Sequence, residues 1–285
     1  MLHTPVARAQ AETAPTTPLL AASAPRGHAP SEEADAIRFH RMRRLDAKLS
    51  TEYDAPRIQR ESCRYESSIA VVPPPQRVAL TFDDGPEPGQ TEHILAVLRK
   101  HAVPATFFMI GEKAQRHPEL VAAVHAEGVH HIGNHSWSHP NFHAISAEQQ
   151  RKELQDTDLA LRAAMGIKLF RYPYGNSTCE TNRLLKSEGY ATVGWHVDSC
   201  DWAFERTGTV DTREAMECSV LPQYHSHYVE HVVSAVRAHN GGVILMHEIH
   251  PNTVRQLEDI ISRLEAEGFK FGALDEEVFA PSLWR

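Results

Sequence analysis

The stretch Val78-Ala79-Leu80-Thr81-Phe82-Asp83-Asp84-Gly85-Pro86 decides how this chain folds. An apolar run stops abruptly at two adjacent carboxylates and a Gly-Pro pair, a pattern that predicts a buried β-strand with two acids at its end. Neighbouring side chains on a strand point to opposite faces, so Asp83 and Asp84 are expected to have different roles. The alternative is a simple Asp-rich turn, because Asp, Gly and Pro all favour turns.

Downstream of this stretch, strand-like apolar runs alternate with amphipathic helical segments. Four of the helical segments finish at a glycine that can end a helix in the left-handed conformation: Gly128, Gly166, Gly189 and Gly268. The predicted strands are 77–82, 104–110, 129–134, 168–172, 190–197, 243–246 and 269–273. This alternation predicts an α/β fold, a distorted (β/α) barrel with about seven parallel strands. Because active sites of such barrels lie at the carboxyl ends of the strands, partners of the two acids should follow other strands.

Composition divides the chain into three segments. Residues 1–33 are rich in Ala, Pro, Thr and Ser and contain few large apolar groups, which predicts a disordered or processing tail. Residues 34–75 are expected to form a helical N-terminal extension and linker, with an amphipathic helix over 34–49 and a run of three prolines near the end. Residues 76–280 would then form the main domain, with an expanded loop at 203–232.

Charge and hydropathy exclude some classes of partner. A formal net charge of −8 argues against general binding of nucleic acid, which requires a clustered positive field. No apolar run approaches the ~18 residues of a membrane span, and the N-terminus lacks the basic and apolar regions of a clear signal peptide. The oligomeric state stays open.

Four cysteines are widely spaced and contain no C-x-x-C pair, which argues against structural zinc: Cys63, Cys179, Cys200 and Cys218. They are compatible with one or two disulfides in an oxidising compartment, with the pairing open, and equally with buried free thiols.

Two histidines four residues apart follow the third predicted strand, in Asn134-His135-Ser136-Trp137-Ser138-His139-Pro140. One turn of helix would present both imidazoles to a single ion. Two His and one carboxylate form a common catalytic metal set, because this set leaves coordination positions open for water and substrate. The His pair alone is weak, but together with the acidic end of the first strand it predicts a metal site.

Other strand ends also carry polar groups. Phe170-Arg171-Tyr172-Pro173-Tyr174-Gly175 follows the fourth strand, Asp198-Ser199-Cys200-Asp201-Trp202 follows the fifth, and His247 follows the sixth. A barrel built for stability alone has no need of such groups at every strand end, so a functional site is expected there.

Taken in order, five motifs resemble the polysaccharide deacetylase family, also called the NodB-homology or carbohydrate esterase family four domain: Thr-Phe-Asp-Asp-Gly-Pro, His-Ser-x-x-His, Arg-x-Pro-Tyr-Gly, Asp-Ser-x-Asp-Trp and Leu-x-His. The resemblance covers residues 76 to about 275. It implies a hydrolase that removes N-acetyl groups from N-acetylhexosamine polymers, with peptidoglycan ahead of chitin-like glycans, in the periplasm, the cell envelope or the medium. The alternatives are a chitin oligosaccharide deacetylase, an acetylxylan esterase and a catalytically silent glycan-binding member.

The resemblance also implies a metal site. Asp84, His135 and His139 would hold a divalent metal, usually zinc and sometimes cobalt. Asp83 would be the general base that takes a proton from the attacking water. Arg171 would pair with Asp83 and fix its direction.

The remaining motifs imply roles around the acetyl group. His247 would protonate the leaving amine, and a contact from Asp201 would favour its cationic form. The backbone N–H of Tyr174 would stabilise the oxyanion, within a substrate-binding set that includes Pro173. Trp202 would form an apolar wall beside the acetyl methyl, although ordinary core packing is an equal alternative for this side chain.

The chain departs from the family pattern in two places. Tyr172 stands where members usually have a proline, which would reshape a subsite. The stretch from 203 to about 231 is long and contains His225-Ser226-His227-Tyr228 and His231. A substrate-shaping loop is favoured there over a second metal site. His247-Glu248-Ile249-His250 is one residue short of the zinc-protease motif, so a protease is discounted.

Overall fold

The computed structural model describes residues 69–284. The tail predicted over 1–33, the helix predicted over 34–49 and Cys63 lie outside the described residues. Within this part of the chain, no helix is both long enough and apolar enough to cross a bilayer.

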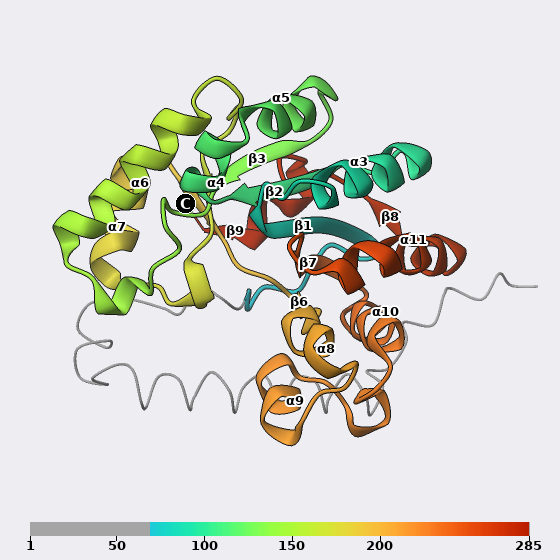
Figure 1. Ribbon diagram of the computed structural model, residues 1–285. Coiled ribbons are helices and arrows are strands. Elements are labelled where there is room, and N and C mark those ends of the chain that lie inside the picture. Colours follow the sequence, from blue (N-terminus) through green and yellow to red (C-terminus); the bar gives the residue numbers. More distant parts are fainter. Residues whose placement is uncertain (1–68, 285) are drawn as a thin grey trace, which may run out of the picture.

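The strands of residues 69–284 form one mostly parallel sheet that is curled into a half-barrel (Figure 1). They are β1 (Arg77–Gly85), β2 (Ala105–Met109), β3 (His131–Asn134), β4 (Leu169–Phe170), β5 (Ala191–Val193), β6 (Val197–Asp198), β7 (Gly241–His247), β8 (Lys270–Phe271) and β9 (Leu283–Trp284). The order in the sheet is β6-β7-β1-β2-β3-β4-β5-β9, with β8 paired to β1 and only β9 antiparallel to its neighbour. The predicted α/β fold is therefore confirmed.

Helices cover the outside of the sheet. They are α3 (Gln90–His101), α4 (Gly111–Arg116), α5 (Pro118–Ala126), α6 (Ala147–Leu161), α7 (Cys179–Ser187), α8 (Asp201–Thr207), α9 (Thr212–Cys218), α10 (Tyr228–His239) and α11 (Pro251–Ala266), with short 3₁₀ helices η1 (Phe142–Ala144), η2 (Pro173–Gly175), η3 (Pro222–Tyr224) and η4 (Glu277–Ser282). Helices α3, α10 and α11 lie on one side of the molecule, and α6 and α7 lie at the opposite end (Figure 1). Helices α8 and α9 project together beside the end of β6 (Figure 1).

Strand β1 lies in the middle of the sheet and is buried on both faces. Val78, Leu80 and Phe82 pack into the larger hydrophobic core beneath the helices. Ala79, on the opposite face, belongs to a smaller core with Phe108. Burial on both faces explains why the strand reads as a continuous apolar run rather than an alternating one.

The expectation of a single strand over 190–197 is wrong. Residues 191–193 form β5, which pairs with β4, whereas residues 197–198 form β6, which pairs with β7. Residues 194–196 thus carry the chain from one end of the strand order to the other, and the N–H of His196 donates to the carbonyl of Val243 on β7. We name residues 194–196 the crossing segment. One continuous strand cannot pair with both β4 and β7, because these two strands are far apart in the order of the sheet. Residues 190–197 therefore contain two short strands instead of one.

One prediction about the end of a helix is also wrong. Gly128, Gly189 and Gly268 have φ of 68°, 79° and 85°, as expected of glycines after a helix. Gly166 is not left-handed, because α6 already ends at Leu161 and a turn separates the two residues.

The segment predicted as an expanded loop at 203–232 is largely helical. It contains most of α8, all of α9 and the start of α10. A disulfide between Cys200 and Cys218 joins the start of α8 to the end of α9, with the two Cα atoms 5.5 Å apart. We name residues 201–218 the α8–α9 wall. Of the two alternatives left open for the cysteines, Cys200 and Cys218 form a disulfide and are not buried free thiols.

Candidate functional site

The end of β1 places two adjacent carboxylates in one cavity of about 550 Å³. In a regular strand Asp83 and Asp84 would point to opposite faces. Here the register of β1 against β2 shifts between Asp83 and Gly85, and Asp84 has a φ of 72°. A non-glycine residue in the left-handed region is disfavoured and persists only where its surroundings hold it. The irregular turn is what lets both acids face the same space.

Three potential metal ligands converge beside this turn. Oδ1 of Asp84 lies 3.3 Å from Nε2 of His135 and 3.2 Å from Nε2 of His139. This Oδ1 is buried and accepts no hydrogen bond from the described residues. A buried carboxylate oxygen without a donor, facing two imidazole nitrogens, fits a divalent cation that prefers nitrogen and oxygen ligands, such as zinc.

The two histidines are held by a loop rather than by the expected turn of helix. Residues 135–141 contain no helix, and Ser136 and His139 have φ of 67° and 58°. Nδ1 of His135 lies 2.8 Å from the carbonyl oxygen of Arg171, so the N–H at Nδ1 donates there and Nε2 is left with a lone pair for the cluster. The prediction of a helical turn was wrong because the H-x-x-x-H spacing fits a loop with left-handed residues as well.

Burial alone would raise the pKa of Asp84. The neighbouring imidazoles of His135 and His139, with a smaller contribution from His247, outweigh burial and hold this pKa well below its usual value. The carboxyl group is therefore ionised at neutral pH, which is the state that binds a cation.

Asp83 faces the same cavity from a different set of contacts. Its Oδ1 accepts a hydrogen bond from Nη1 of Arg171 at 2.8 Å, and its Oδ2 lies 3.6 Å from Nε2 of His135. Arg171 is almost fully buried and also donates to Thr81 on β1. The geometry fixes a carboxylate directly beside the three-ligand cluster.

Arg171 is held from the opposite direction by the backbone around the crossing segment. Its Nε donates to the carbonyl of Val193 at 3.1 Å, and its Nη2 donates to the carbonyl of Gly194 at 3.0 Å. The guanidinium carbon lies 4.3 Å from the centre of the Phe108 ring. With its donors engaged on several sides, the guanidinium has one orientation.

His247, at the end of β7, lines the same cavity and is the register partner of Asp83 on β1. Its Nδ1 lies 2.7 Å from Oδ1 of Asp201, and its backbone N–H donates to Oδ2 of Asp201 at 2.6 Å. Burial alone would lower the pKa of His247, but the Asp201 carboxylate outweighs burial and raises it to about 10. The imidazole is thus a cation near neutral pH, with Nδ1 engaged and Nε2 available to a ligand.

A second group in the described residues also has metal-ligand spacing, namely Asp201, His247 and His250. The oxygens of Asp201 already accept hydrogen bonds from the backbone of His247 and of Trp202, from the His247 ring and from Thr253. These bonds account for the group without an ion.

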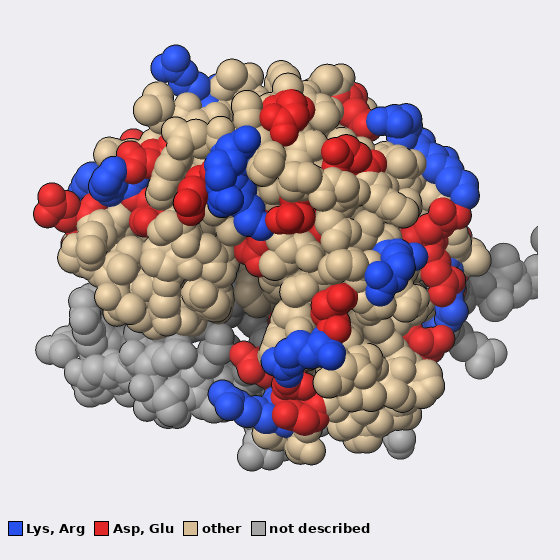
Figure 2. Space-filling model, in the orientation of Figure 1, with Lys and Arg blue, Asp and Glu red and all other residues tan. Residues whose placement is uncertain are grey.

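Aromatic and charged side chains form the sides of the cavity. Tyr174 is 61% exposed, has a φ of 56°, and its ring centre lies 4.7 Å from that of His139. Trp202 of the α8–α9 wall lines the cavity, with the guanidinium of Arg206 5.6 Å from its ring centre. Pro173 is buried and does not itself line the cavity, whereas its neighbours Tyr172 and Tyr174 do. In Figure 2 acidic and basic groups are intermixed on the part of the surface formed by α8 and α9.

The second metal site considered around His225, His227 and His231 is not formed. His231 is buried, its Nε2 bonds the carbonyl oxygen of Asp198 at 2.9 Å, and its ring stacks on Phe204. Burial lowers its pKa to about 4. Among the described residues, none of these three histidines belongs to a group with metal-ligand spacing.

Sequence reasoning missed several residues around the cavity. Trp195, Arg206 and Arg213 line it, and Glu248 is fully buried directly after His247. Glu248 could have been found from the sequence, because it follows a buried apolar strand, which is the same pattern that identified Asp83. The cavity-lining arginines lie on helices whose packing no motif predicts.

The chain is similar to known glycan deacetylases. Residues 70–193 match the family model described as polysaccharide deacetylase. The peptidoglycan-N-acetylglucosamine deacetylase PgdA of Listeria monocytogenes is 31% identical over 204 residues, which cover 70% of this chain but only 38% of that protein. The chitooligosaccharide deacetylase of a Bradyrhizobium strain is 33% identical over 216 residues, covering 70% of this chain and 89% of that protein.

A solved structure shares the fold. The family 4 carbohydrate esterase from Streptomyces lividans, in complex with acetate, superimposes with a TM-score of 0.56 at 32% identity. The match covers 69% of this chain and 91% of the esterase.

Proposed function

The chain belongs to the polysaccharide deacetylase family, and from this premise we propose that it is a metal-dependent deacetylase of N-acetylhexosamine polymers, with peptidoglycan as the first substrate. One observation carries the proposal. The three-ligand cluster of Asp84, His135 and His139, the Asp83–Arg171 pair and the His247–Asp201 pair all reach a single cavity. Each pair supplies one of the proton-handling groups that amide hydrolysis requires.

Asp84, His135 and His139 would hold the cation. When bound, a divalent cation such as zinc supplies a Lewis acid for the acetyl carbonyl and lowers the pKa of water toward ~7. Asp83 accepts a proton from the attacking water, and Arg171 keeps its carboxylate directed at that water. The backbone N–H of Tyr174 donates to the oxyanion as the carbonyl carbon becomes tetrahedral.

His247 completes the reaction by acting on the leaving group. The bond between the carbonyl carbon and nitrogen breaks, acetate leaves, and the Nε2 proton of His247 passes to the amine. The raised pKa of His247 supports this role, because the group starts the reaction protonated. Trp202 provides an apolar surface beside the acetyl methyl, and the rest of the α8–α9 wall contacts the sugar chain.

The alternative substrate is a chitin oligosaccharide. It is supported by the Bradyrhizobium relative, which this chain covers over 89% of that protein's length. Acetylxylan esters would use the same groups, but an alkoxide leaving group depends less on His247 than an amine does.

The family relationship also supports an envelope location, since relatives named as peptidoglycan deacetylases act on the cell wall. The disulfide between Cys200 and Cys218 is consistent with an oxidising compartment.

Measuring acetate release tests the proposal. The full chain is incubated with zinc and either peptidoglycan, chitin oligosaccharides or acetylxylan. We expect zinc-dependent release that is fastest from peptidoglycan. Faster release from chitin oligosaccharides would establish the alternative substrate, and no release from any acetylated glycan would leave a silent glycan-binding protein.

A further inference from the structure

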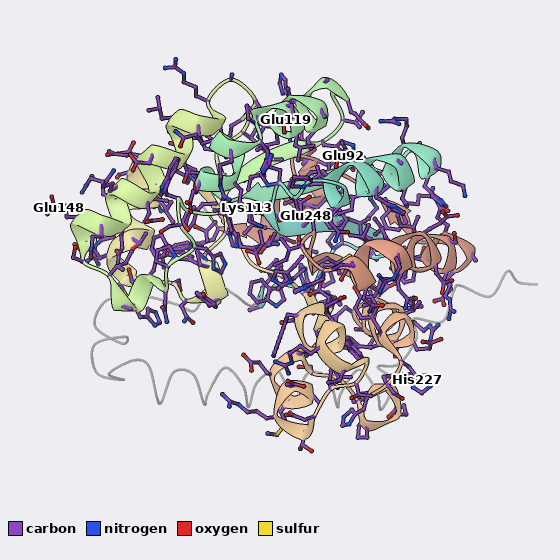
Figure 3. All side chains as sticks on the ribbon, in the orientation of Figure 1. Glu92, Lys113, Glu119, Glu148, His227 and Glu248 are labelled. Carbon is purple, nitrogen blue, oxygen red and sulfur yellow. A yellow bond between two sulfur atoms is a disulfide. The ribbon has the colours of Figure 1, made fainter. Side chains whose placement is uncertain are left out.

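Glu248 is a buried carboxyl group that none of the steps above uses. It follows His247 at the end of β7, is 0% exposed, and lies inside the molecule close to Lys113 (Figure 3). Its backbone N–H donates to the carbonyl of Asp83 at 3.1 Å. Its Oε2 accepts a hydrogen bond from Oγ1 of Thr91 at 3.1 Å. A buried carboxyl group is destabilising unless it is hydrogen-bonded, so its presence behind the cavity requires a reason.

The side chain packs directly against the turn that carries the two acids. A Cβ atom added at Gly85 would lie 0.9 Å from Oε1 of Glu248 and 2.1 Å from its carboxyl carbon. Gly85 does not have a positive φ, so its backbone conformation is open to other residues. A side chain at position 85 would therefore displace the buried carboxyl group of Glu248.

Glu248 also connects the two sides of the turn. Its backbone holds Asp83, on the strand side, and its carboxyl group holds Thr91 at the start of α3. Oγ1 of Thr91 in turn accepts a hydrogen bond from the backbone N–H of Glu87, on the helix side, at 2.9 Å. The left-handed Asp84 lies between these two fixed points, and such a conformation persists only when its surroundings determine it.

We propose that Glu248 is a positioning residue for the metal-binding turn, where its carboxyl group packs on Gly85, bonds Thr91 and so sets the position of Asp84. The inference rests on the proposed function, because it assumes that Asp84 binds a metal ion. Residues that orient metal ligands typically change metal affinity by about 10- to 100-fold when they are replaced.

Three substitutions separate shape from charge. Burial raises the pKa of Glu248 to about 8, only partly offset by Thr91 and Lys113, so the group is largely neutral at pH 7. Glu248→Gln keeps the length and the acceptor for Thr91, so we expect zinc affinity within about threefold of the wild type. Glu248→Asp and Glu248→Ala lose the contact with Gly85, and we expect zinc affinity to fall about tenfold or more.

The experiment measures zinc affinity of the full chain by competition with a chromophoric chelator, which does not depend on catalysis. Leu264→Ala is the matched control, since Leu264 is fully buried near the end of α11 that is remote from the cavity. This variant loses core stability without touching the turn. We expect its zinc affinity to equal that of the wild type.

A double-variant cycle tests the contact itself. Gly85→Ala alone should weaken zinc binding, because its methyl group meets Oε1 of Glu248. Adding Glu248→Ala should restore part of the affinity, because the shorter side chain leaves room for the methyl group. Such recovery is not expected from a residue that only stabilises the fold.

Two results would overturn the inference: wild-type zinc affinity in Glu248→Ala, or an equal loss in Leu264→Ala. If the wild type itself fails to bind zinc, the proposed function is contradicted first. A wild type that binds zinc, together with unaffected Glu248 variants, contradicts only the positioning role.

Discussion

Two hydrogen bonds join His247 to the carboxylate of Asp201: Nδ1 of the imidazole lies 2.7 Å from Oδ1, and the backbone N–H of His247 donates to Oδ2. Asp201 is 1% exposed, and burial would raise its pKa, but the contact with His247 outweighs burial and lowers it. Each group therefore stabilises the charged form of the other. The pair fixes both the direction and the protonation of the proposed acid.

Replacing Asp201 by Asn should move the alkaline limb of the activity profile. Without the carboxylate, burial dominates and the pKa of His247 falls from about 10 toward or below 6.5. We expect the pH at which kcat/KM declines to fall by more than about two units, and the rate at pH 8 to drop about 100-fold. Thr253→Val removes one bond to Asp201 but keeps its charge, so its limb should stay close to that of the wild type.

The same pair predicts how stability depends on pH. Folded His247 keeps its proton up to about pH 10, whereas the unfolded residue releases it near ~6.5. Between these values the folded state binds more protons, so the free energy of unfolding of the metal-free protein should fall as pH rises. Urea unfolding at several pH values measures the slope. The free energy of unfolding of His247→Gln should depend less on pH, and an equal slope in both proteins would contradict the raised pKa of His247.

Asp83→Asn should separate catalysis from metal binding. The amide keeps the volume of Asp83 but cannot accept the water proton, so kcat should fall about 100-fold or more. Zinc affinity should change by only a few fold, because Asp83 is not one of the three ligands. Acetate release and zinc titration measure the two quantities. Activity retained by this variant would exclude Asp83 as the base.

Metal removal should affect thermal stability as well as activity. A ligand that binds only the folded state stabilises it, by about 2.7 kcal/mol at a concentration 100 times its Kd. We expect a chelator to lower the Tm of the wild type, and zinc to restore it. His139→Ala should show neither response. If zinc shifts both Tm values equally, it binds elsewhere.

Breaking the disulfide between Cys200 and Cys218 should loosen the α8–α9 wall. The bond closes a loop with a sequence separation of 18, for which chain entropy predicts a loss of about 3 kcal/mol. Cys200 also precedes Asp201, so Cys218→Ala should lower kcat in addition to Tm. Thermal unfolding and kinetics of Cys218→Ala, with and without reductant, check both effects. Because Cys179 is also disulfide-bonded, a reductant should lower the Tm of a Cys200→Ala, Cys218→Ala double variant less than that of the wild type.

The sequence predicted those parts of the fold that depend on local pattern. The run before Asp83 is apolar because β1 is buried on both faces, and that signal survives without knowledge of its neighbours. The seven predicted strand regions all contain strands of the sheet. The division of 190–197 between β5 and β6 was not predictable, because it depends on partners more than 40 residues further along the chain for β6.

For the candidate site, too, the sequence predicted the residues that belong to motifs but not the features that depend on distant contacts. The motifs identified Asp84, His135 and His139, which the structure brings together, but not the loop that holds the two histidines. Backbone irregularities such as the left-handed His139 leave no periodic signal. The packing of Glu248 on Gly85 was also invisible, because contacts between distant strand ends follow from the register of the sheet rather than from spacing.

Arg171 has a consequence for how such a protein can evolve. The same guanidinium that directs Asp83 also binds the carbonyls of Val193 and Gly194, where the chain crosses between the two ends of the sheet. A lineage that no longer needed the reaction could lose His139 or His247 by drift and keep its architecture. Loss of Arg171 would remove the activity and also the contacts that hold the chain where it crosses between the two ends of the sheet. Inactive descendants should therefore retain Arg171.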